Sequence, residues 1–280
     1  MATIVEEVGT MVAENVAEIL RSADGAPPAP NQSIWGLLAD GGWQTISADS
    51  ENGMELREIL EVARVTGRFP YSTPLVPTLL AGRWFDLDEE QLARGAVPVF
   101  HRGSETVVPY YTAGLIVLDG TGSLVTASPT STQIFSLLVP MAVFPEETVG
   151  LTDRQLAEAG AAFAAVAVGA ADAVITKAVE WAQTREQFGQ KIKAFQAVRH
   201  HLANAHIARE QAWTAAIAAA HEPENAGRWA HQAFALSRTA IELGIQVHGG
   251  VGFTWEVGLH HFLDHVIELD SLLGENHDRP

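Results

Sequence analysis

Residues 152–189 read TDRQLAEAGAAFAAVAVGAADAVITKAVEWAQTREQFG, and the part from 152 to 182 predicts one long, buried helix. Thr152 can cap the first turn, and the acidic and glutamine side chains that follow it are typical of a helix start. Residues 159–171 carry no charge and are apolar on nearly every helical face, so we expect them at the centre of the protein. This run is too short to cross a bilayer, and no membrane span is expected.

Helical patterns also dominate the rest of the chain outside its middle. Apolar residues recur at three- and four-residue steps in residues 6–22 and 53–67, and residues 34–43 resemble a short helix ended by glycines. A proline-rich loop at 24–32 lies between them. After the long helix, three more helices are expected at residues 195–220, 225–247 and 258–273.

The middle of the chain predicts short strands instead. Runs of β-branched and aromatic residues separated by Gly, Asp and Ser occur at 97–103, 105–111, 114–120 and 122–128. They suffice for a small sheet of about four or five strands lying on helices, but not for a full barrel. We therefore expect a mainly α fold with a small β region, divided into an N-terminal helical domain (1–94), a reduced β-domain (95–147) and a C-terminal four-helix bundle (148–280).

Charge and composition exclude several kinds of function. The formal net charge is −17 and there is no cysteine, which excludes disulfides, thiolate nucleophiles and cysteine-ligated metals. Nucleic acid is not an expected partner, because phosphate-backbone binding needs clustered Lys and Arg. The N-terminus has no basic leader, so we expect a cytoplasmic protein. Any phosphate site must depend on a few placed arginines and backbone amides.

Two motifs carry the most specific information. The first is the run Arg185-Glu186-Gln187-Phe188-Gly189 with Lys191-Ile192 and Phe195-Gln196-Ala197-Val198 after it, and the second is QVHGGVGFTWE at residues 246–256. In residue type and spacing they resemble the flavin-binding turn and the C-terminal glycine-rich run of the acyl-CoA dehydrogenase family. Weaker agreement occurs at residues 35–43 and 61–75, so the resemblance covers nearly the whole chain, with one gap.

The resemblance implies half of a shared FAD site. In the family, the residues at these positions reach the FAD of the neighbouring subunit. Arg185 offers a fork of donors that suits a pyrophosphate, and Gly249 and Gly250 allow backbone to approach phosphates. Taken alone, each motif is also typical of a capped helix end or a turn. By matching position, the adenine and pyrophosphate half of the site consists of Arg185, Gln187, Phe188, Ile192, Phe195, Gln196, Gln246, Gly249 and Gly250.

The other half of the family's active site has no counterpart here. The family's Thr-Glu and Gly-Ser-Asp segments, which cradle the flavin ring, are missing between residues 91 and 128. The two positions at which family members carry the catalytic carboxylate are occupied by Leu273 and Ala159. Glu158 is adjacent to Ala159 but points about 100° away around a helix, and Glu256 fits better as an acid near a helix N-terminus. No catalytic residue is assigned.

The histidines and serines offer two other chemistries, a zinc site and a serine hydrolase. His261 and His265 lie one helical turn apart with His260 beside them, but zinc would need a third ligand and supporting hydrogen bonds. An exposed, histidine-rich helix is the preferred interpretation, and no metal site is assigned. Because no Gly-x-Ser-x-Gly turn occurs, serine-hydrolase chemistry has no signature.

Taken as a whole, the resemblance implies a short subunit of a heteromeric (α2β2) acyl-CoA dehydrogenase. A longer homologous partner would hold the flavin ring, the catalytic carboxylate and the acyl-CoA, while this chain supplies the residues above to the partner's FAD. A steroid side-chain CoA as substrate follows only by analogy with heteromeric family members. Two alternatives stay open: a self-sufficient homodimeric flavoenzyme, and a scaffold or binding protein that has lost flavin and catalysis.

Overall fold

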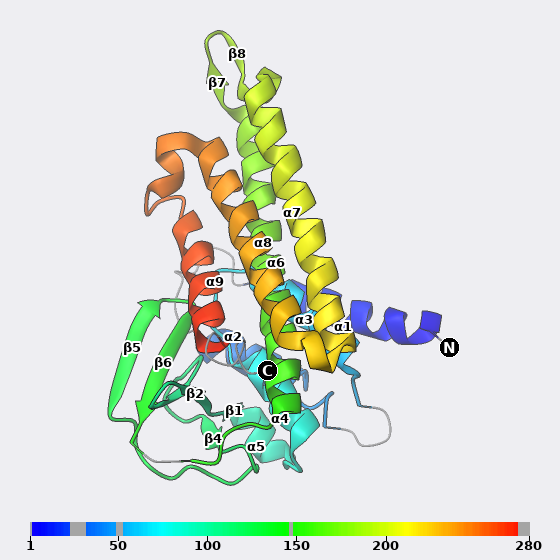
Figure 1. Ribbon diagram of the computed structural model, residues 1–280, viewed down its shortest axis with the longest axis vertical. Coiled ribbons are helices and arrows are strands. Elements are labelled where there is room, and N and C mark those ends of the chain that lie inside the picture. Colours follow the sequence, from blue (N-terminus) through cyan, green and yellow to red (C-terminus); the bar gives the residue numbers. More distant parts are fainter. Residues whose placement is uncertain (1, 23–31, 49–52, 146–147, 274–280) are drawn as a thin grey trace.

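The computed structural model describes residues 2–22, 32–48, 53–145 and 148–273. Helix α6 (Asp153–Thr184) runs through the centre of the molecule and is packed against the helices that follow it (Figure 1). These are α7 (Gln196–His221), α8 (Ala226–His248) and α9 (Leu259–Leu273). The four long C-terminal helices therefore lie where the periodicity predicts them, whereas most of the proline-rich loop at 24–32 lies outside the described residues.

Helix α6 begins and is buried as its sequence predicts. Thr152 forms a capping box with Gln155: the Thr152 N–H donates to the Gln155 side chain at 2.8 Å, and the Gln155 N–H donates to Thr152 Oγ1 at 3.3 Å. Residues 158–171 are all buried. Among the described helices α6 alone is long and apolar enough to span a membrane, but 78% of its most apolar window is buried inside the protein. It is therefore a core helix.

The N-terminal part is helical and packs directly on α6. It contains α1 (Ala2–Ser22), α2 (Gln32–Asp40), α3 (Leu56–Gly67), α4 (Leu75–Trp84) and α5 (Glu89–Arg94). Helix α3 crosses α6 at two glycines, Gly67 and Gly169, where a Cβ atom on either one would collide with the backbone of the other helix. Asp172 of α6 stabilises this helix crossing.

The carboxylate of Asp172 accepts hydrogen bonds from Arg64 and Arg68 and forms an ion pair with Arg209. Arg64 Nε lies at 2.9 Å, Arg68 Nη2 at 3.0 Å and Arg209 Nε at 3.1 Å. The side chains of Asp172, Arg64 and Arg209 are largely buried, so these interactions act in a region that water screens weakly. They tie α3, α6 and α7 together.

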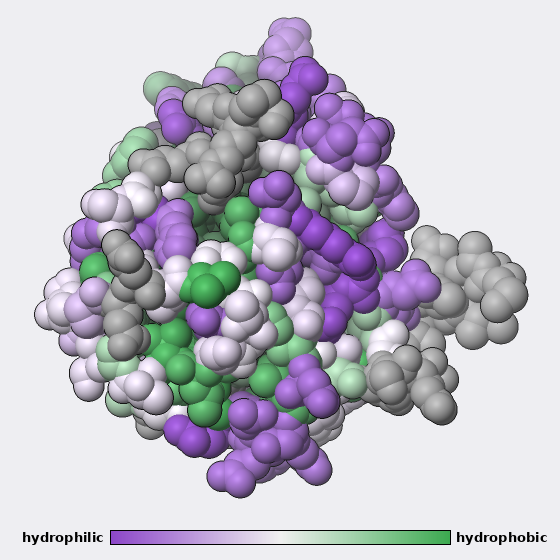
Figure 2. All heavy atoms as spheres, turned by 60° about the horizontal axis from the view of Figure 1, so that its bottom comes forward, coloured by the Kyte–Doolittle hydropathy of each residue, from purple (hydrophilic) through white to green (hydrophobic). Residues whose placement is uncertain are grey.

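Two small sheets cover one side of this helical body. Their strands are β1 (Ala96–Pro98), β2 (Phe100–Arg102), β3 (Glu105–Val108), β4 (Ile116–Leu118), β5 (Ser131–Ser136) and β6 (Val139–Phe144). β1 and β4 form a parallel pair, and the other four form an antiparallel sheet in the order β2-β3-β6-β5 that packs against α9. Strand β5 lies at one edge of this sheet (Figure 1). Seen from the end where the sheets lie, apolar patches appear among hydrophilic side chains (Figure 2).

The strand prediction was wrong for residues 122–128. This segment makes only an isolated bridge, Leu118 to Leu124, because Asp119 organises a turn just before it. Asp119 Oδ1 accepts from the backbone N–H groups of Thr121 and Ser123, at 2.8 and 3.0 Å, and such local bonds compete with strand pairing. β5 and β6 instead use residues 131–144, which the sequence pattern did not single out.

Candidate functional site

The residues predicted to bind a dinucleotide lie at one end of the helical bundle, uppermost in Figure 1. There α6 ends at a hairpin made of β7 (Glu186–Gln187) and β8 (Gln190–Lys191), and the 3-10 helix η1 (Ile192–Ala194) leads into α7. The C-terminal end of α8 and the 3-10 helix η3 (Gly249–Phe253) lie at the same end. The fold therefore brings both sequence motifs to one region of the surface.

A small apolar cluster joins the two motifs. Ile192 is 8% exposed and packs in one cluster with Val247 of α8 and with Ala178 and Ala182 of α6. Phe195 is half-buried against the same cluster. The Ile192 N–H also donates to the Arg185 carbonyl at 2.9 Å. Of the nine predicted residues, Ile192 is therefore buried and Phe195 half-buried.

Those other residues are exposed. Seven of the nine predicted residues are classed as exposed: Arg185, Gln187, Phe188, Gln196, Gln246, Gly249 and Gly250. At the hairpin tip Phe188 and Gly189 both have positive φ, 52° and 79°, which matches a tight two-residue hairpin turn. A phenylalanine in this conformation is strained, and this one is 92% exposed, with only an edge contact to Phe195 at 6.1 Å.

Arg185 is oriented by aromatic rings that the sequence interpretation did not include. Its guanidinium carbon lies 5.6 Å from the centre of the Trp181 ring, and Trp181 in turn stacks on His248 at 5.7 Å with an interplanar angle of 17°. His248 Nδ1 lies 2.9 Å from the Gly244 carbonyl. The i, i+4 spacing of Trp181 and Arg185 in the sequence could have indicated their contact. No sequence pattern indicates the contact between Trp181 and His248.

The glycine loop is open on one side. Gly249 has φ 66° and ψ −146°, a conformation that side chains rarely adopt, and a Cβ atom on Gly249 or Gly250 would meet nothing within 4 Å. The Gly249 N–H already donates to the Gln246 carbonyl, so this amide is used as a helix cap. Gly252, by contrast, is buried, and a Cβ there would lie 2.7 Å from the Ile245 carbonyl oxygen. The loop is thus anchored at Gly252 and open at Gly249 and Gly250.

The charges at this end suit an anion. Residues 185–199 contain four cations (Arg185, Lys191, Lys193, Arg199) and one acid (Glu186), a local excess of +3 in a chain of net charge −17. In the part of the chain that the structure describes, none of these four cations has a carboxylate partner within salt-bridge distance. A guanidinium without a carboxylate partner and open glycine backbone at the same end of the bundle are groups that suit the pyrophosphate of FAD.

Large apolar side chains are also exposed in these two segments. Phe188, Val251, Phe253 and Trp255 are 92%, 39%, 70% and 74% exposed. Exposed apolar groups gathered at one place mark surfaces that contact another molecule. This end of the bundle therefore has the character of an interface as well as of an anion site.

The opposite end of α6 is closed and has no candidate base. Glu158 is buried, and its carboxylate accepts hydrogen bonds from Trp84 Nε1 at 2.8 Å, Arg83 Nε at 3.1 Å and Arg154 Nε at 3.1 Å. Burial would raise the pKa of Glu158, but the Trp84 hydrogen bond and the Arg83 charge outweigh it and hold this pKa below its ordinary value. A carboxylate stabilised in this way is a poor proton acceptor.

The two positions that align with the family's catalytic carboxylate are apolar and buried. Ala159 is 0% exposed and Leu273 is 2% exposed. Leu273 Cδ1 would lie 3.8 Å from a Cβ atom built on Gly160, so α6 and α9 are in contact here. Glu256 is exposed, and hydrogen bonds from its own backbone N–H and from Thr254 lower its pKa, so it does not provide a dry general base either.

The prediction of an exposed histidine-rich helix is wrong. His261 and His265 are 5% and 3% exposed because α9 packs against α6, α8 and the sheet. His265 Nε2 shares a hydrogen bond of 3.0 Å with the hydroxyl of Tyr110, and burial lowers the pKa of His265 to about 3. Over residues 2–22, 32–48, 53–145 and 148–273, no three His, Cys, Asp or Glu side chains are grouped to hold a metal ion.

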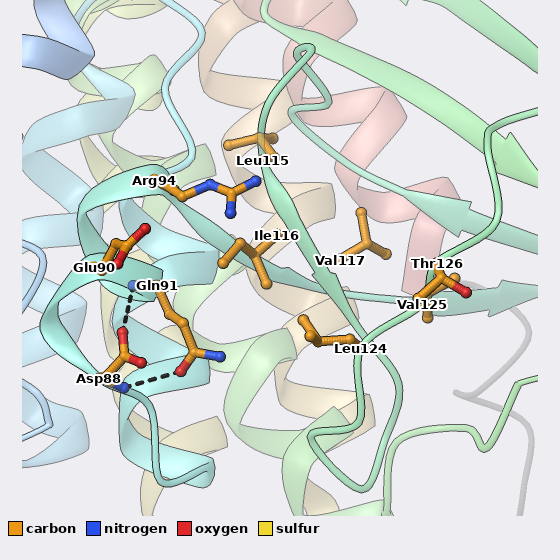
Figure 3. A pocket seen from close by; sticks show the side chains of 10 residues that line it. All are labelled: Asp88, Glu90, Gln91, Arg94, Leu115, Ile116, Val117, Leu124, Val125 and Thr126. Carbon is orange, nitrogen blue, oxygen red and sulfur yellow. Dashed lines mark hydrogen bonds between the residues drawn. The ribbon is translucent and has the colours of Figure 1, made fainter.

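Two surface hollows lie away from the predicted residues. One, of about 340 Å³, lies between α5 and β4, and the Arg94 guanidinium lies over its apolar side chains, which include Ile116 and Leu124 (Figure 3). The other, of about 350 Å³, lies between α8 and α9 and is lined by polar residues such as Arg238 and Asp270. None of the nine predicted residues lines either of these two hollows.

Known proteins of one family are similar to this chain over most of its length. Residues 150–267 match the family described as acyl-CoA dehydrogenase, C-terminal domain. The chain is 30% identical over 276 residues to acyl-CoA dehydrogenase IpdE2 of Mycobacterium tuberculosis, covering 91% of this chain and 87% of that protein. It is 28% identical over 294 residues to the IpdE2 of Mycolicibacterium smegmatis, covering 96% and 93%.

Solved structures show the same fold at low sequence identity. A variant of the Tcur3481-Tcur3483 steroid ACAD matches with a TM-score of 0.72 at 19% identity, covering 97% of this chain and 93% of that one. The ChsE4-ChsE5 complex from Mycobacterium tuberculosis matches with a TM-score of 0.68 at 19% identity, covering 98% and 93%. Butyryl-CoA dehydrogenase from Megasphaera elsdenii matches at 0.69 and 13%, covering 95% and 93%. The predicted fold class, mainly helical with small sheets and a C-terminal helical domain, is confirmed.

Proposed function

Because this chain belongs to the acyl-CoA dehydrogenase family, we propose that it is the short subunit of a heteromeric, FAD-dependent acyl-CoA dehydrogenase. It supplies the adenine and pyrophosphate half of an FAD site to a longer homologous subunit. That partner holds the flavin ring, the catalytic carboxylate and the acyl-CoA thioester, which is dehydrogenated between its α and β carbons. FAD, when bound, supplies the acceptor for the hydride.

One observation carries the proposal: the difference in chemistry between the predicted dinucleotide residues and the positions of the catalytic base. Arg185 is an exposed guanidinium without a carboxylate partner among the described residues, and it is linked through the Trp181 and His248 rings to open glycine backbone. Ala159 and Leu273 are buried and cannot accept a proton. A chain with the first feature and without the second can bind a cofactor that works elsewhere, but it cannot complete the reaction by itself.

Each exposed residue has a role in this proposal. Arg185 donates two parallel hydrogen bonds to the pyrophosphate, the geometry that a planar guanidinium offers. Gln187, Gln196 and Gln246 present amide groups, which can donate to and accept from the adenosine portion. Phe188 fills an apolar recess of the partner, which explains why a strained, solvent-exposed phenylalanine is kept at the hairpin tip.

The partner and the substrate are proposed from the relatives. The ChsE4-ChsE5 match is a complex of two named chains, and the Tcur3481-Tcur3483 match is named a steroid ACAD. We therefore infer an α2β2 assembly and a steroid side-chain CoA thioester as the substrate class. The absence of cysteine agrees with action in the cytoplasm.

The test compares the chain made alone with the chain made together with a longer homologous subunit. Flavin absorbance and the ratio of FAD to protein chains are measured for both preparations. We expect a colourless chain alone and a yellow complex with one FAD for each pair of unlike chains. One FAD held entirely within copies of this chain would instead establish the homodimeric flavoenzyme.

A matched pair of variants then tests the site. Arg185→Ala should strip FAD from the complex, because in the proposed complex the exposed Arg185 becomes buried against the pyrophosphate, and truncating a charge that is buried and hydrogen-bonded at an interface costs about 2–5 kcal/mol. Arg228→Ala is the control: Arg228 is also exposed but lies at the start of α8, at the other end of that helix. If Arg185→Ala left flavin content and activity unchanged, the chain would be a scaffold and the proposal would fail.

A further inference from the structure

A stack of three side chains links the two motifs of the candidate site. Arg185 lies on one aromatic ring, Trp181, and Trp181 lies on a second, His248, which directly precedes Gly249. Trp181 belongs to α6 and His248 to the last turn of α8. The guanidinium and the glycine loop, which come from different helices, are thus connected through two rings.

His248, at one end of this stack, is hydrogen-bonded to the backbone. The 2.9 Å contact between His248 Nδ1 and the Gly244 carbonyl makes Nδ1 the donor, because a carbonyl oxygen only accepts. The bond spans one turn of α8 and sets the ring orientation of His248. Trp181 also packs on the cluster that contains Ile192 and Val247, so its own ring has little freedom.

Arg185 itself has no comparable restraint. Its side chain is exposed and has no carboxylate partner among the described residues, and a free arginine side chain has many rotamers to lose when it binds a ligand. A guanidinium placed on an indole face loses part of that freedom before the ligand arrives. Preorganisation of this kind increases affinity without adding a contact to the ligand.

We propose that Trp181 and His248 are positioning residues of the dinucleotide site, which hold the Arg185 guanidinium at a fixed place relative to Gly249 and Gly250. The inference rests on the proposed function, since it concerns how that site is prepared for FAD. Neither residue touches the cofactor in this proposal. Both act through Arg185 and the glycine loop.

The experiment is a double-mutant cycle on the complex with the longer subunit, read as the Kd of FAD added to the apo complex. Trp181→Leu removes the aromatic face and should weaken FAD binding about tenfold when Arg185 is present. In the Arg185→Ala background the same change should alter the Kd less than about twofold, because there is no guanidinium left to hold. A purely structural tryptophan would give equal factors in both backgrounds, and that result would overturn the inference.

Further variants distinguish a positioning role of Trp181 and His248 from a role in folding. Trp181→Phe keeps an aromatic face and should restore FAD binding to within about threefold of the unaltered complex. His248→Ala removes the second ring and should weaken FAD binding in the same direction as Trp181→Leu. The melting temperature of each variant chain is measured in parallel; if the Kd followed that temperature rather than the presence of an aromatic ring, the inference would be wrong.

The two proposals fail in different ways. If Arg185→Ala does not change FAD binding, the proposed function is wrong, whatever Trp181 does. If Arg185→Ala abolishes tight binding but Trp181→Leu does not weaken it, or weakens it equally in both backgrounds, the shared site stands and the positioning role is rejected.

Discussion

The two ends of helix α6 have opposite surroundings. At its N-terminal end Thr152 caps the helix in a capping box with Gln155, Glu158 accepts from three donors, and Ala159 lies in the core. At its C-terminal end Arg185 and the β7–β8 hairpin are exposed, and Phe188 is held in a strained conformation in solvent. We call these the closed end and the open end.

The difference indicates that the closed end contributes mainly to folding stability and the open end mainly to function. At the closed end the charge of Glu158 is matched by Arg83 and Arg154, so substitutions there should affect folding. At the open end cations lack carboxylate partners among the described residues and apolar groups lack cover, so substitutions there should affect a complex more than the fold. Measuring both properties for variants at both ends tests this division directly.

The largest effect is expected for Glu158→Ala at the closed end. It leaves Arg83 and the Trp84 indole N–H without their acceptor in a buried place, which should cost about 3 kcal/mol of the free energy of unfolding. Urea denaturation at neutral pH measures this loss. The control is Glu186→Ala in the exposed hairpin, which should change stability by less than about 0.5 kcal/mol. Loss of turnover by the complex with unchanged stability would instead point to a catalytic role for Glu158.

A pH titration should reveal the buried His265, whose partner Tyr110 packs on Phe163 of α6. Its pKa is about 3 in the folded protein and near 6.5 in the unfolded chain, so only the unfolded chain binds a proton as the pH falls below 6.5. Stability is therefore present above pH 6.5 and is lost downward, by about 2 kcal/mol between pH 6.5 and 5.

Neighbouring groups are controlled for by the variant His265→Phe. Burial lowers the pKa of His261, which adds to the acid destabilisation, whereas burial raises the pKa values of Asp264 and Glu268, which opposes it. The His265 contribution is the difference in slope between the unaltered chain and the variant, measured by urea denaturation at each pH. Identical slopes would show that His265 titrates normally.

A medium effect is expected for Thr152→Ala. This change removes the capping-box bond from the Gln155 N–H to Thr152 Oγ1 and the bond from the Thr152 hydroxyl to the Gln155 side chain, and loss of such a cap costs about 1 kcal/mol. Thermal unfolding of the isolated chain measures the loss. Thr152→Ser keeps the hydroxyl and should retain most of the stability; equal losses for both variants would show that the hydroxyl is not what stabilises the helix start.

The smallest effect on folding is expected for Phe188→Asn at the open end. Asparagine accepts positive φ more readily than phenylalanine, so the melting temperature of the isolated chain should stay the same or rise slightly, by the equivalent of about 0.5 kcal/mol. Assembly with the longer subunit should weaken, as measured by analytical ultracentrifugation of the mixture. A marked fall in melting temperature would mean that Phe188 supports the fold and not the interface.

Sequence patterns predicted the helices well because their signals are local. The composition of residues 159–171 alone indicates a buried helix, and Thr152 marks its start. Trp181 and His248 are far apart in sequence, so the stack that orients Arg185 had no local signal. The same is true of His261 and His265, whose burial depends on where the sheet packs and not on the pattern of α9 itself.

Strand β5 has a practical consequence for work with this chain. Among the described strands it pairs only with β6, its residues Ser131–Ser136 carry no charge, and Phe135 is 64% exposed. Natural edge strands are commonly protected from joining other strands by lysine, proline or a bulge, and here only a register irregularity between Gln133 and Ser136 serves that purpose. When the chain is produced in isolation, intermolecular strand addition along β5 should therefore drive aggregation, and a lysine introduced at Thr132 should improve the yield of monodisperse protein.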